Sequence, residues 1–336
     1  LADCPGADPS TLMSVEFIGM PPPATSAEKA DAYSSAVMRA SCAGGETTDY
    51  PLRYHQIFAT TDRVGASVVG GLFNAAGEPL TDNDGQMASD GPDGTSLIQI
   101  EGIEAEAIQG NPLAMVTQFE FKDLPPNDGV STGGFWSKLP AVMGLTLLDQ
   151  DPASGLLAPK AYRPIDFSGV NGGWIHCGST LSAWNTHIGS EEYEPDAKVR
   201  GGGTPADDSD DRTDIASFSQ YYFGDAATAN PYHYGLVPEI TVGADGGTRV
   251  VKHHAPGRYA REMQIMAADD RTAIGGDDGK NTGLFMFVAD KAADLSAGTL
   301  YAAKATQTSA ENGGSFDLDW IRLGHASNAE IEALVN

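Results

Sequence analysis

The chain has 336 residues, of which 41% are hydrophobic, and this is enough for a packed core in one large domain or two ordinary ones. It carries 46 acidic against 20 basic residues, a net charge of −26, so its surface would repel nucleic acid. No apolar run approaches the roughly 20 residues that a membrane helix needs, so we predict no transmembrane segment. A salt-adapted surface, carboxylates that hold divalent cations and the solubility of a secreted protein are all open explanations for the acidity.

Residues 1–48 read as an N-terminal extension. The first residues show neither a basic region nor an apolar one, as in a mature secreted chain whose signal peptide has been removed. A Ser/Thr cap signal followed by Glu28 and good helix formers predicts a short helix over residues 25–41. Cys4 and Cys42 flank this helix, and a disulfide between them would anchor the extension.

Residues 49–336 have the rhythm of short strands. Apolar runs alternate with Gly, Pro, Asn and Asp turns, and the clearest runs are SVVGGLF, SLIQI, LAMVTQFEF and TGLFMFVA. The 40 glycines and 20 prolines suit many tight turns and disfavour a helical or parallel α/β fold. The last segment, 327–336, starts with a cap-like Ser-Asn pair and predicts a C-terminal helix.

The fold class that this pattern predicts is all-β, with short peripheral helices. So many strands close more easily as a β-propeller than as a sandwich, because radial repetition removes exposed edges. No clean repeat of about 40 residues is visible, however. We therefore predict a β-propeller over residues 49–336, complete or incomplete in this chain.

The first group of candidate ligands lies in residues 172–197, on a segment broken by glycines. Its members are Cys177, His187, Glu191, Glu192, Glu194 and Asp196. A thiolate prefers iron, zinc or copper, whereas grouped carboxylates prefer calcium, magnesium, manganese or ferric iron, so the segment predicts one mixed metal site or two adjacent sites.

Single members of this group have simpler interpretations too. An unpaired Cys177 in a secreted protein is either buried and inert, or a ligand or a nucleophile. In a strand, Glu192 and Glu194 would face one side and Glu191 the other, so at least one carboxylate would point inward. His187, close to Trp184 in the sequence, is expected to be packed and hydrogen-bonded.

The second group lies in residues 256–291. Asp277 and Asp278 have glycines on both sides, which lets the backbone wrap closely and leaves both carboxylates free to converge on a cation. Arg258, Arg261 and Glu262 fall in the preceding strand. A buried Glu262 would have to be paired or metal-bound, because an isolated buried carboxylate is too costly.

Three further acidic features are weaker indications of a metal site. Glu120 ends an apolar strand, and surface exposure is the simpler interpretation from sequence alone. The segment 90–95, DGPDGT, predicts a turn first and an oxygen-ligand loop second. The run ADDSDDRTD at 206–214 predicts a loop, which would suit a hard cation if it folded back on itself.

In their order and spacing, these residues resemble the bacterial PhoX-type alkaline phosphatase family, secreted β-propellers with an iron and calcium cluster. The resemblance rests on Trp174–Cys177, Trp184–His187, Ser190–Ala197, Gly257–Tyr259 with Glu262, and Gly276–Asp278. It implies Fe3+ ligation by Cys177 and Glu262. It also implies Ca2+ ligation by acidic loop residues, for which the candidates are Glu191, Glu192, Asp277 and Asp278. Glu120 is a further candidate metal ligand.

The sequence departs from the family pattern in places. Arg261 stands where the family usually has a histidine. Relatives also often have a histidine just before the residue that corresponds to Glu120, where this chain has Gln118-Phe119. The family continues to an Arg-Pro-Glu motif, but the Arg163-Pro164 pair here is followed by Ile165. The chain therefore looks like the N-terminal portion of a longer relative.

The function that the resemblance implies is a secreted phosphomonoesterase with an iron and calcium cluster, complete only with a second chain or a C-terminal segment. Arg258 and Arg261 are its candidate catalytic residues, as donors to the phosphate oxygens. The alternative is a non-catalytic, calcium-stabilised propeller with a cell-surface, filament or binding role. Either protein is expected to be secreted, periplasmic or at the cell surface.

Overall fold

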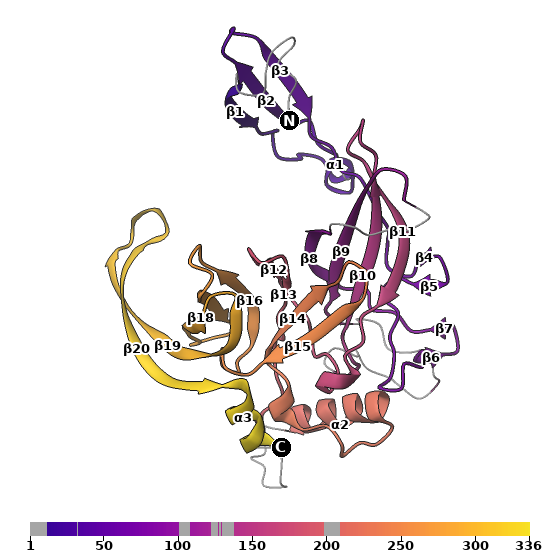
Figure 1. The fold of residues 1–336 in the computed structure, drawn as a ribbon, viewed down its shortest axis with the longest axis vertical. Helices are drawn as coiled ribbons and strands as arrows, with labels where there is room; N and C mark the ends of the chain where they lie inside the picture. Colours follow the sequence, from indigo (N-terminus) through magenta and orange to yellow (C-terminus); the bar gives the residue numbers. More distant parts are fainter. Residues whose placement is uncertain are drawn as a thin grey trace. The chain divides into compact units, whose positions relative to one another are not determined.

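The computed structural model describes residues 12–31, 33–100, 108–121, 127, 129, 138–197 and 209–336, with the backbone alone at 209–212. Within these ranges the chain forms six antiparallel sheets and three short α-helices (Figure 1). The predicted all-β class with short peripheral helices is confirmed. None of the described helices is both long enough and apolar enough to cross a membrane.

The chain divides into two compact units, Leu1–Ile57 and Phe58–Asn336. The first contains a three-stranded sheet in the order β1 (Leu12–Ile18), β2 (Val37–Cys42), β3 (Thr47–Pro51). Cys42 is disulfide-bonded. Its predicted partner, Cys4, lies outside the described residues.

The helix predicted for residues 25–41 is wrong over most of its length. Only α1 (Ser26–Lys29) forms, and it begins with the expected cap, in which the Glu28 backbone N–H donates to Thr25 Oγ1 at 3.2 Å. Residues 37–42 are instead the central strand β2, which pairs with both β1 and β3. Hydrogen bonds to strands on both sides outweigh the local helix preference.

The second unit contains three larger sheets, whose strands are hydrogen-bonded in chain order. The first sheet consists of β8 (Pro92–Gln99), β9 (Asn111–Phe119), β10 (Val142–Gln150) and β11 (Leu157–Pro164). The second consists of β12 (Thr180–Leu181), β13 (His187–Ile188), β14 (Val237–Val242) and β15 (Thr248–His253). The third consists of β16 (Arg261–Met266), β17 (Thr272–Asp277), β18 (Leu284–Lys291), β19 (Asp294–Ser309) and β20 (Ser315–Ser327).

Two smaller hairpins complete the strands of this unit. They are β4 (Arg63–Val64) with β5 (Ser67–Val68), and β6 (Thr81–Asp82) with β7 (Gly85–Gln86).

The three larger sheets pack on one another through shared apolar clusters. Ile98 and Val116 of the first sheet pack with Ile240 of the second. Ile188 of the second sheet packs with Phe287 of the third. Successive antiparallel sheets that pack in chain order are typical of propeller blades. Within the described residues they close into no ring, as expected of an incomplete propeller.

The acidic run predicted as a loop at 206–214 is helical where it is described. Residues 206–208 lie outside the described ranges, and α2 (Ser209–Phe223) begins directly after them. Phe218 of α2 is fully buried and packs against Trp174, at 5.4 Å between ring centroids, and against Tyr234. Burial of aromatic side chains further along the segment explains why it is helical.

The predicted C-terminal helix is confirmed as α3 (Asn328–Val335), capped by Ser327 and Glu330. Asn328 also anchors this helix to the end of β15. Its Oδ1 accepts hydrogen bonds from the backbone N–H groups of His254 and Ala255, both at 2.9 Å, and its Nδ2 lies 3.0 Å from His253 Nδ1.

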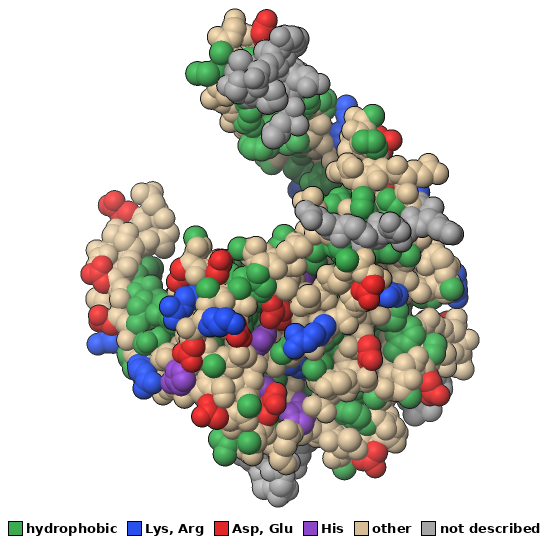
Figure 2. All heavy atoms as spheres, viewed as in Figure 1, with side chains coloured by type: hydrophobic (Ala, Val, Ile, Leu, Met, Phe, Trp, Pro, Cys, Tyr) green, Lys and Arg blue, Asp and Glu red, His purple; other side chains and the backbone are tan. Residues whose placement is uncertain are grey.

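The third sheet has one buried face and one exposed apolar face. Ile265, Ile274, Met286 and Tyr301 are register neighbours across β16 to β19 on the exposed face. Ile265 is 54% exposed, and Leu318 of the edge strand β20 is 42% exposed. Hydrophobic side chains are visible along the β19–β20 hairpin in Figure 2. The opposite face carries Phe287 and packs on the second sheet.

Candidate metal centre

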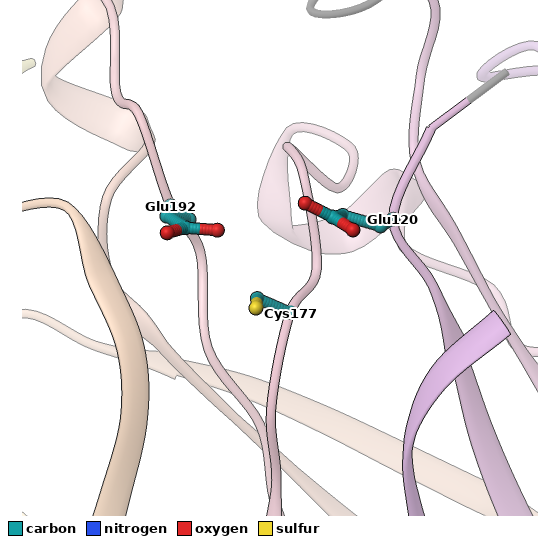
Figure 3. Close-up of side chains that lie close together, drawn as sticks. All are labelled: Glu120, Cys177 and Glu192. Atoms are coloured by element: carbon teal, nitrogen blue, oxygen red, sulfur yellow. The ribbon is translucent and has the colours of Figure 1, made fainter. Parts of the chain in front are cut away.

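Three predicted ligands meet at one point of the second unit. Glu120 follows the end of β9, Cys177 lies on the segment before β12, and Glu192 follows β13. One ligand atom from each lies within 4.8 Å of the other two, and their side chains converge in Figure 3. Cys177 is a free thiol that is 8% exposed, and Glu192 is 3% exposed. A thiol and two carboxylates are therefore concentrated in a largely buried space.

A third acidic side chain, Asp93 of β8, lies next to the thiol of this group. Cys177 Sγ lies 3.4 Å from Asp93 Oδ2, within hydrogen-bonding distance for sulfur. The sequence interpretation of residues 90–95 as a turn left Asp93 out of the candidate ligands. The alternative interpretation of the segment as an oxygen-ligand loop was the signal that could have found it.

The backbone of Cys177 and Gly178 ties these elements together. The Cys177 carbonyl accepts hydrogen bonds from Gly94 N at 3.1 Å and from Gln118 Nε2. The Gly178 carbonyl accepts one from Ser190 Oγ at 2.8 Å, and Gly178 N donates to the Glu262 carbonyl at 2.8 Å.

The residues that make these contacts with Cys177 and Gly178 are close in sequence to the acidic residues of the centre. Gly94 follows Asp93, and Gln118 and Ser190 each lie two residues before a clustered glutamate. The packing is close at Gly94, where a Cβ atom would lie 2.5 Å from Ser179 N. Backbone hydrogen bonds thus fix the relative positions of the ligand-bearing segments.

The carboxylates of this centre repel one another in the absence of a cation. Burial raises the pKa of Glu120, the charges of Asp93 and Glu262 add to the rise, and together they bring it to about 7. The pKa of Glu192 is likewise raised to about 7: burial is the largest cause, the hydrogen bond with Cys177 opposes it, and the charges of Glu120, Asp278 and Glu262 add to the rise. A bound cation would offset the free-energy cost of burying these carboxylates close together.

The thiol is held in its neutral form by the same surroundings. Burial raises the pKa of Cys177, and the charges of Glu192 and Asp93 raise it further. A bound cation would have to displace this proton, because the thiolate is the ligand form. The donor set, one sulfur among several carboxylate oxygens, fits a mixed site for a thiophilic ion and an oxygen-seeking ion.

Two further predicted ligands lie around these residues. Glu262 is exposed, on the bulged part of β16, and its charge acts on both Glu120 and Glu192. Asp278 accepts a hydrogen bond from the Tyr193 hydroxyl, and its charge acts on Glu192. The structure does not bring either residue into the group formed by Glu120, Cys177 and Glu192, so ligation by Glu262 or Asp278 stays a prediction.

Asp277 and Glu191 have other contacts. Asp277 Oδ1 accepts a hydrogen bond from Ala260 N at 3.1 Å. Glu191 is fully buried, and its carboxylate lies 2.6 Å from Lys252 Nζ. The structure does not bring Glu191 into the group formed by Glu120, Cys177 and Glu192.

The two predicted catalytic arginines contact backbone carbonyls. Arg261 is fully buried; its Nη2 donates to the Pro256 carbonyl at 3.1 Å, and its guanidinium stacks on the Tyr259 ring at 3.9 Å. Arg258 Nη2 donates to the carbonyls of Pro195 and Pro231. A direct role of either arginine toward phosphate stays a prediction.

His187 lies behind the centre as a packed, hydrogen-bonded residue. It is fully buried, with Nδ1 2.9 Å from Ser96 Oγ and Nε2 3.2 Å from Gln118 Oε1. Both ring nitrogens therefore have protein partners, as the sequence interpretation of this residue expected.

Comparison with protein families identifies the class of the chain. The model of the family "Alkaline phosphatase PhoX" matches residues 146–335, which include Cys177, Glu192, Glu262 and Asp278. Comparison with curated proteins and with solved structures gave no match. Since the matched segment is more than half of the chain, the chain belongs to the PhoX alkaline phosphatase family.

Proposed function

We propose that this chain carries the metal centre of a PhoX-type phosphomonoesterase. The convergence of Glu120, Cys177 and Glu192 in a member of an alkaline phosphatase family is the observation that carries the proposal. Two regions distant in sequence supply these side chains, one with Glu120 and one with Cys177 and Glu192, and hydrogen bonds to the Cys177–Gly178 backbone hold them together. The substrate class would be phosphomonoesters.

The donor set suggests which ions the centre would hold. Cys177 Sγ would be a ligand of Fe3+, because a thiolate serves no evident purpose at an all-oxygen calcium site. Glu120, Glu192, Asp93 and Asp278 would provide oxygen ligands for Ca2+, and Glu262 would join Cys177 as a ligand of the iron.

The protein side chains would do the positioning. Bound cations would neutralise charge on the phosphoryl oxygens. Glu192 would be held in place by the segment that Ser190 and Glu191 anchor. The Tyr193 hydroxyl, at the edge of the centre, holds the Asp278 carboxylate. Arg258 or Arg261 would reach phosphate only after releasing its carbonyl partners.

The location of the protein is also a proposal. The disulfide at Cys42 supports an oxidising compartment, because such bonds are rare in reducing ones. We place the protein outside the cytoplasm: secreted, periplasmic or at the cell surface.

Further polypeptide would complete the fold. The exposed apolar face of the third sheet, which includes Ile265 and Leu318, is of the kind that the other sheets bury against a neighbour. A second chain or a C-terminal segment would cover this face.

Metal analysis of the purified protein tests the proposal. We expect iron and calcium in the wild type, loss of iron in Cys177→Ser, and loss of hydrolysis of a chromogenic phosphomonoester in that variant and with chelator. Asp317→Asn, an exposed change on β20, is the matched control and should retain both metals. Calcium without iron, and no hydrolysis, would support the alternative of a non-catalytic, calcium-stabilised propeller.

A further inference from the structure

A chain of buried hydrogen bonds leads to the backbone of Cys177. It joins Ser96 of β8, Gln118 of β9 and His187 of β13, which are 3%, 0% and 0% exposed. It ends on the backbone carbonyls of Cys177 and Gly178. Three strands from two sheets are therefore connected to the segment that carries the thiol.

The donors and acceptors of this chain can be arranged in only one way. Gln118 Nε2 donates to the carbonyls of Cys177 and Gly178, the latter at 3.2 Å, so its amide N–H groups must face that segment. Gln118 Oε1 then faces His187, whose Nε2 must carry the proton. His187 Nδ1 is left as an acceptor for the Ser96 hydroxyl at 2.9 Å.

The surroundings keep this arrangement fixed. Burial lowers the pKa of His187 to about 3, so the ring is neutral at ordinary pH and keeps a single tautomer. No side chain fits at Gly189, where a Cβ atom would lie 2.2 Å from Gln118 Oε1. The Gln118 amide is thus held on one side by His187 and on the other by the Cys177–Gly178 backbone.

We propose that Gln118 is a positioning residue that sets the place of Cys177 in the metal centre, with His187 and Ser96 fixing its orientation. As a role in metal binding, this inference rests on the proposed function. Gln118 ligates nothing itself. It acts through the two carbonyls that it holds, and these determine where Cys177 Sγ lies relative to Glu120 and Glu192.

The first test uses metal-free protein, so it does not depend on the proposed function. Cys177 is the free thiol of the structure, and its rate of modification by a thiol reagent reports how firmly its segment is held. We expect Gln118→Met to raise this rate about tenfold, since two hydrogen bonds to the Cys177–Gly178 backbone are lost while the Gly94 contact is retained.

The matched control is Thr146→Val. Thr146 lies on β10, is fully buried and has an unpartnered Oγ1, so this variant removes a buried polar group without touching Cys177. Its labelling rate should equal that of the wild type. Ser96→Ala removes only the hydrogen bond farthest from Cys177, so it should raise the labelling rate less than Gln118→Met does. It provides the test if Gln118→Met does not fold. Rates in Gln118→Met and Ser96→Ala equal to that of the control would overturn the proposal.

The second test asks for the effect on metal binding. Cobalt(II) is the probe, because a cobalt–thiolate bond gives a charge-transfer absorption band in the near ultraviolet. Gln118→Met should weaken cobalt binding by about 10- to 100-fold and reduce the band, as is typical when a group that orients a ligand is lost. An unchanged band and affinity in this variant would contradict the positioning role. No band in the wild type would contradict the proposed metal centre, while the labelling rates would still decide the role of Gln118.

Discussion

Lys252 Nζ lies 2.6 Å from Glu191 Oε1, and both side chains are almost entirely buried, at 4% and 0% exposure. Glu191 also accepts hydrogen bonds from the backbone N–H groups of Trp174 and Leu236, both at 3.1 Å. Lys252 Nζ donates further to the His233 carbonyl at 3.1 Å. The pair thus anchors the segment on which the next residue, Glu192, points to Cys177.

The first prediction concerns this buried pair. Lys252→Met should lower the free energy of unfolding by about 3–5 kcal/mol, because it leaves the Glu191 carboxylate buried without its counter-charge. Chemical denaturation measures the change. Lys291→Met is the control: the Lys291–Asp294 pair is largely exposed, and its loss should hardly matter. Equal losses of unfolding free energy in the two variants would show that the buried pair stabilises the protein no more than the exposed pair does.

A second prediction concerns pH. Since the pKa of Glu120 and of Glu192 is about 7 in the folded, metal-free protein, against an ordinary 4.5, the folded state binds protons more tightly than the unfolded state. The stabilisation is complete below about pH 4.5 and is lost as pH rises through 7. Unfolding free energies measured with chelator should therefore fall across this window.

The Glu120→Gln/Glu192→Gln double variant should flatten that pH dependence. Calcium affinity of the wild type should change in the opposite direction, rising over the same window as the carboxylates lose their protons. If the unfolding free energy of the wild type changed with pH as little as that of the double variant, Glu120 and Glu192 would not be the cause of the predicted pH dependence.

A third prediction tests Asp93, which the sequence interpretation omitted. Asp93→Asn should weaken calcium binding by about tenfold, because the site loses a charged oxygen ligand. The calcium concentration needed to raise the melting temperature reports this change. Asp317→Asn should need the same concentration as the wild type. If Asp93→Asn also behaves like the wild type, Asp93 is not a ligand.

A fourth prediction concerns the anchoring of α3 by Asn328. Asn328→Ala removes two hydrogen bonds to backbone N–H groups and one contact with His253, so we expect a loss of about 2 kcal/mol. Hydrogen exchange should show that the α3 amides lose protection before those of β15. Ser327→Ala, which removes the helix cap alone, should cost about 1 kcal/mol. Equal protection of both elements in Asn328→Ala would contradict the anchoring role.

The sequence predicted much of the candidate centre because its patterns are local. Cys177 and Glu192 stand on one glycine-rich segment, whereas Glu120, for which the sequence alone favoured surface exposure, joins them in the structure. Their binding of metal stays a prediction. The sequence could not decide which of the neighbours Glu191 and Glu192 faces the centre, since the answer depends on Lys252 in the distant strand β15.

The other features that the sequence did not predict correctly also depend on contacts with other parts of the chain. Asp93 lies in a Gly-Pro-Asp-Gly stretch that predicts a turn, and only the approach of the Cys177 segment turns it into part of the centre. Residues 37–42 have helix formers but pair with strands on both sides. Local patterns predict the class of fold and the kind of ligand, whereas non-local pairing selects the individual side chains.

The hydrogen bonds made by the Cys177–Gly178 backbone also imply an order of events. Gly94 of β8, Gln118 of β9 and Glu262 of β16 all hydrogen-bond to that backbone, so Glu120 reaches Cys177 and Glu192 only when these strands have docked around it. A peptide that carries Cys177 and Glu192 alone would lack Glu120 of this group. Metal would therefore be loaded late, into a nearly finished fold, and would not nucleate folding.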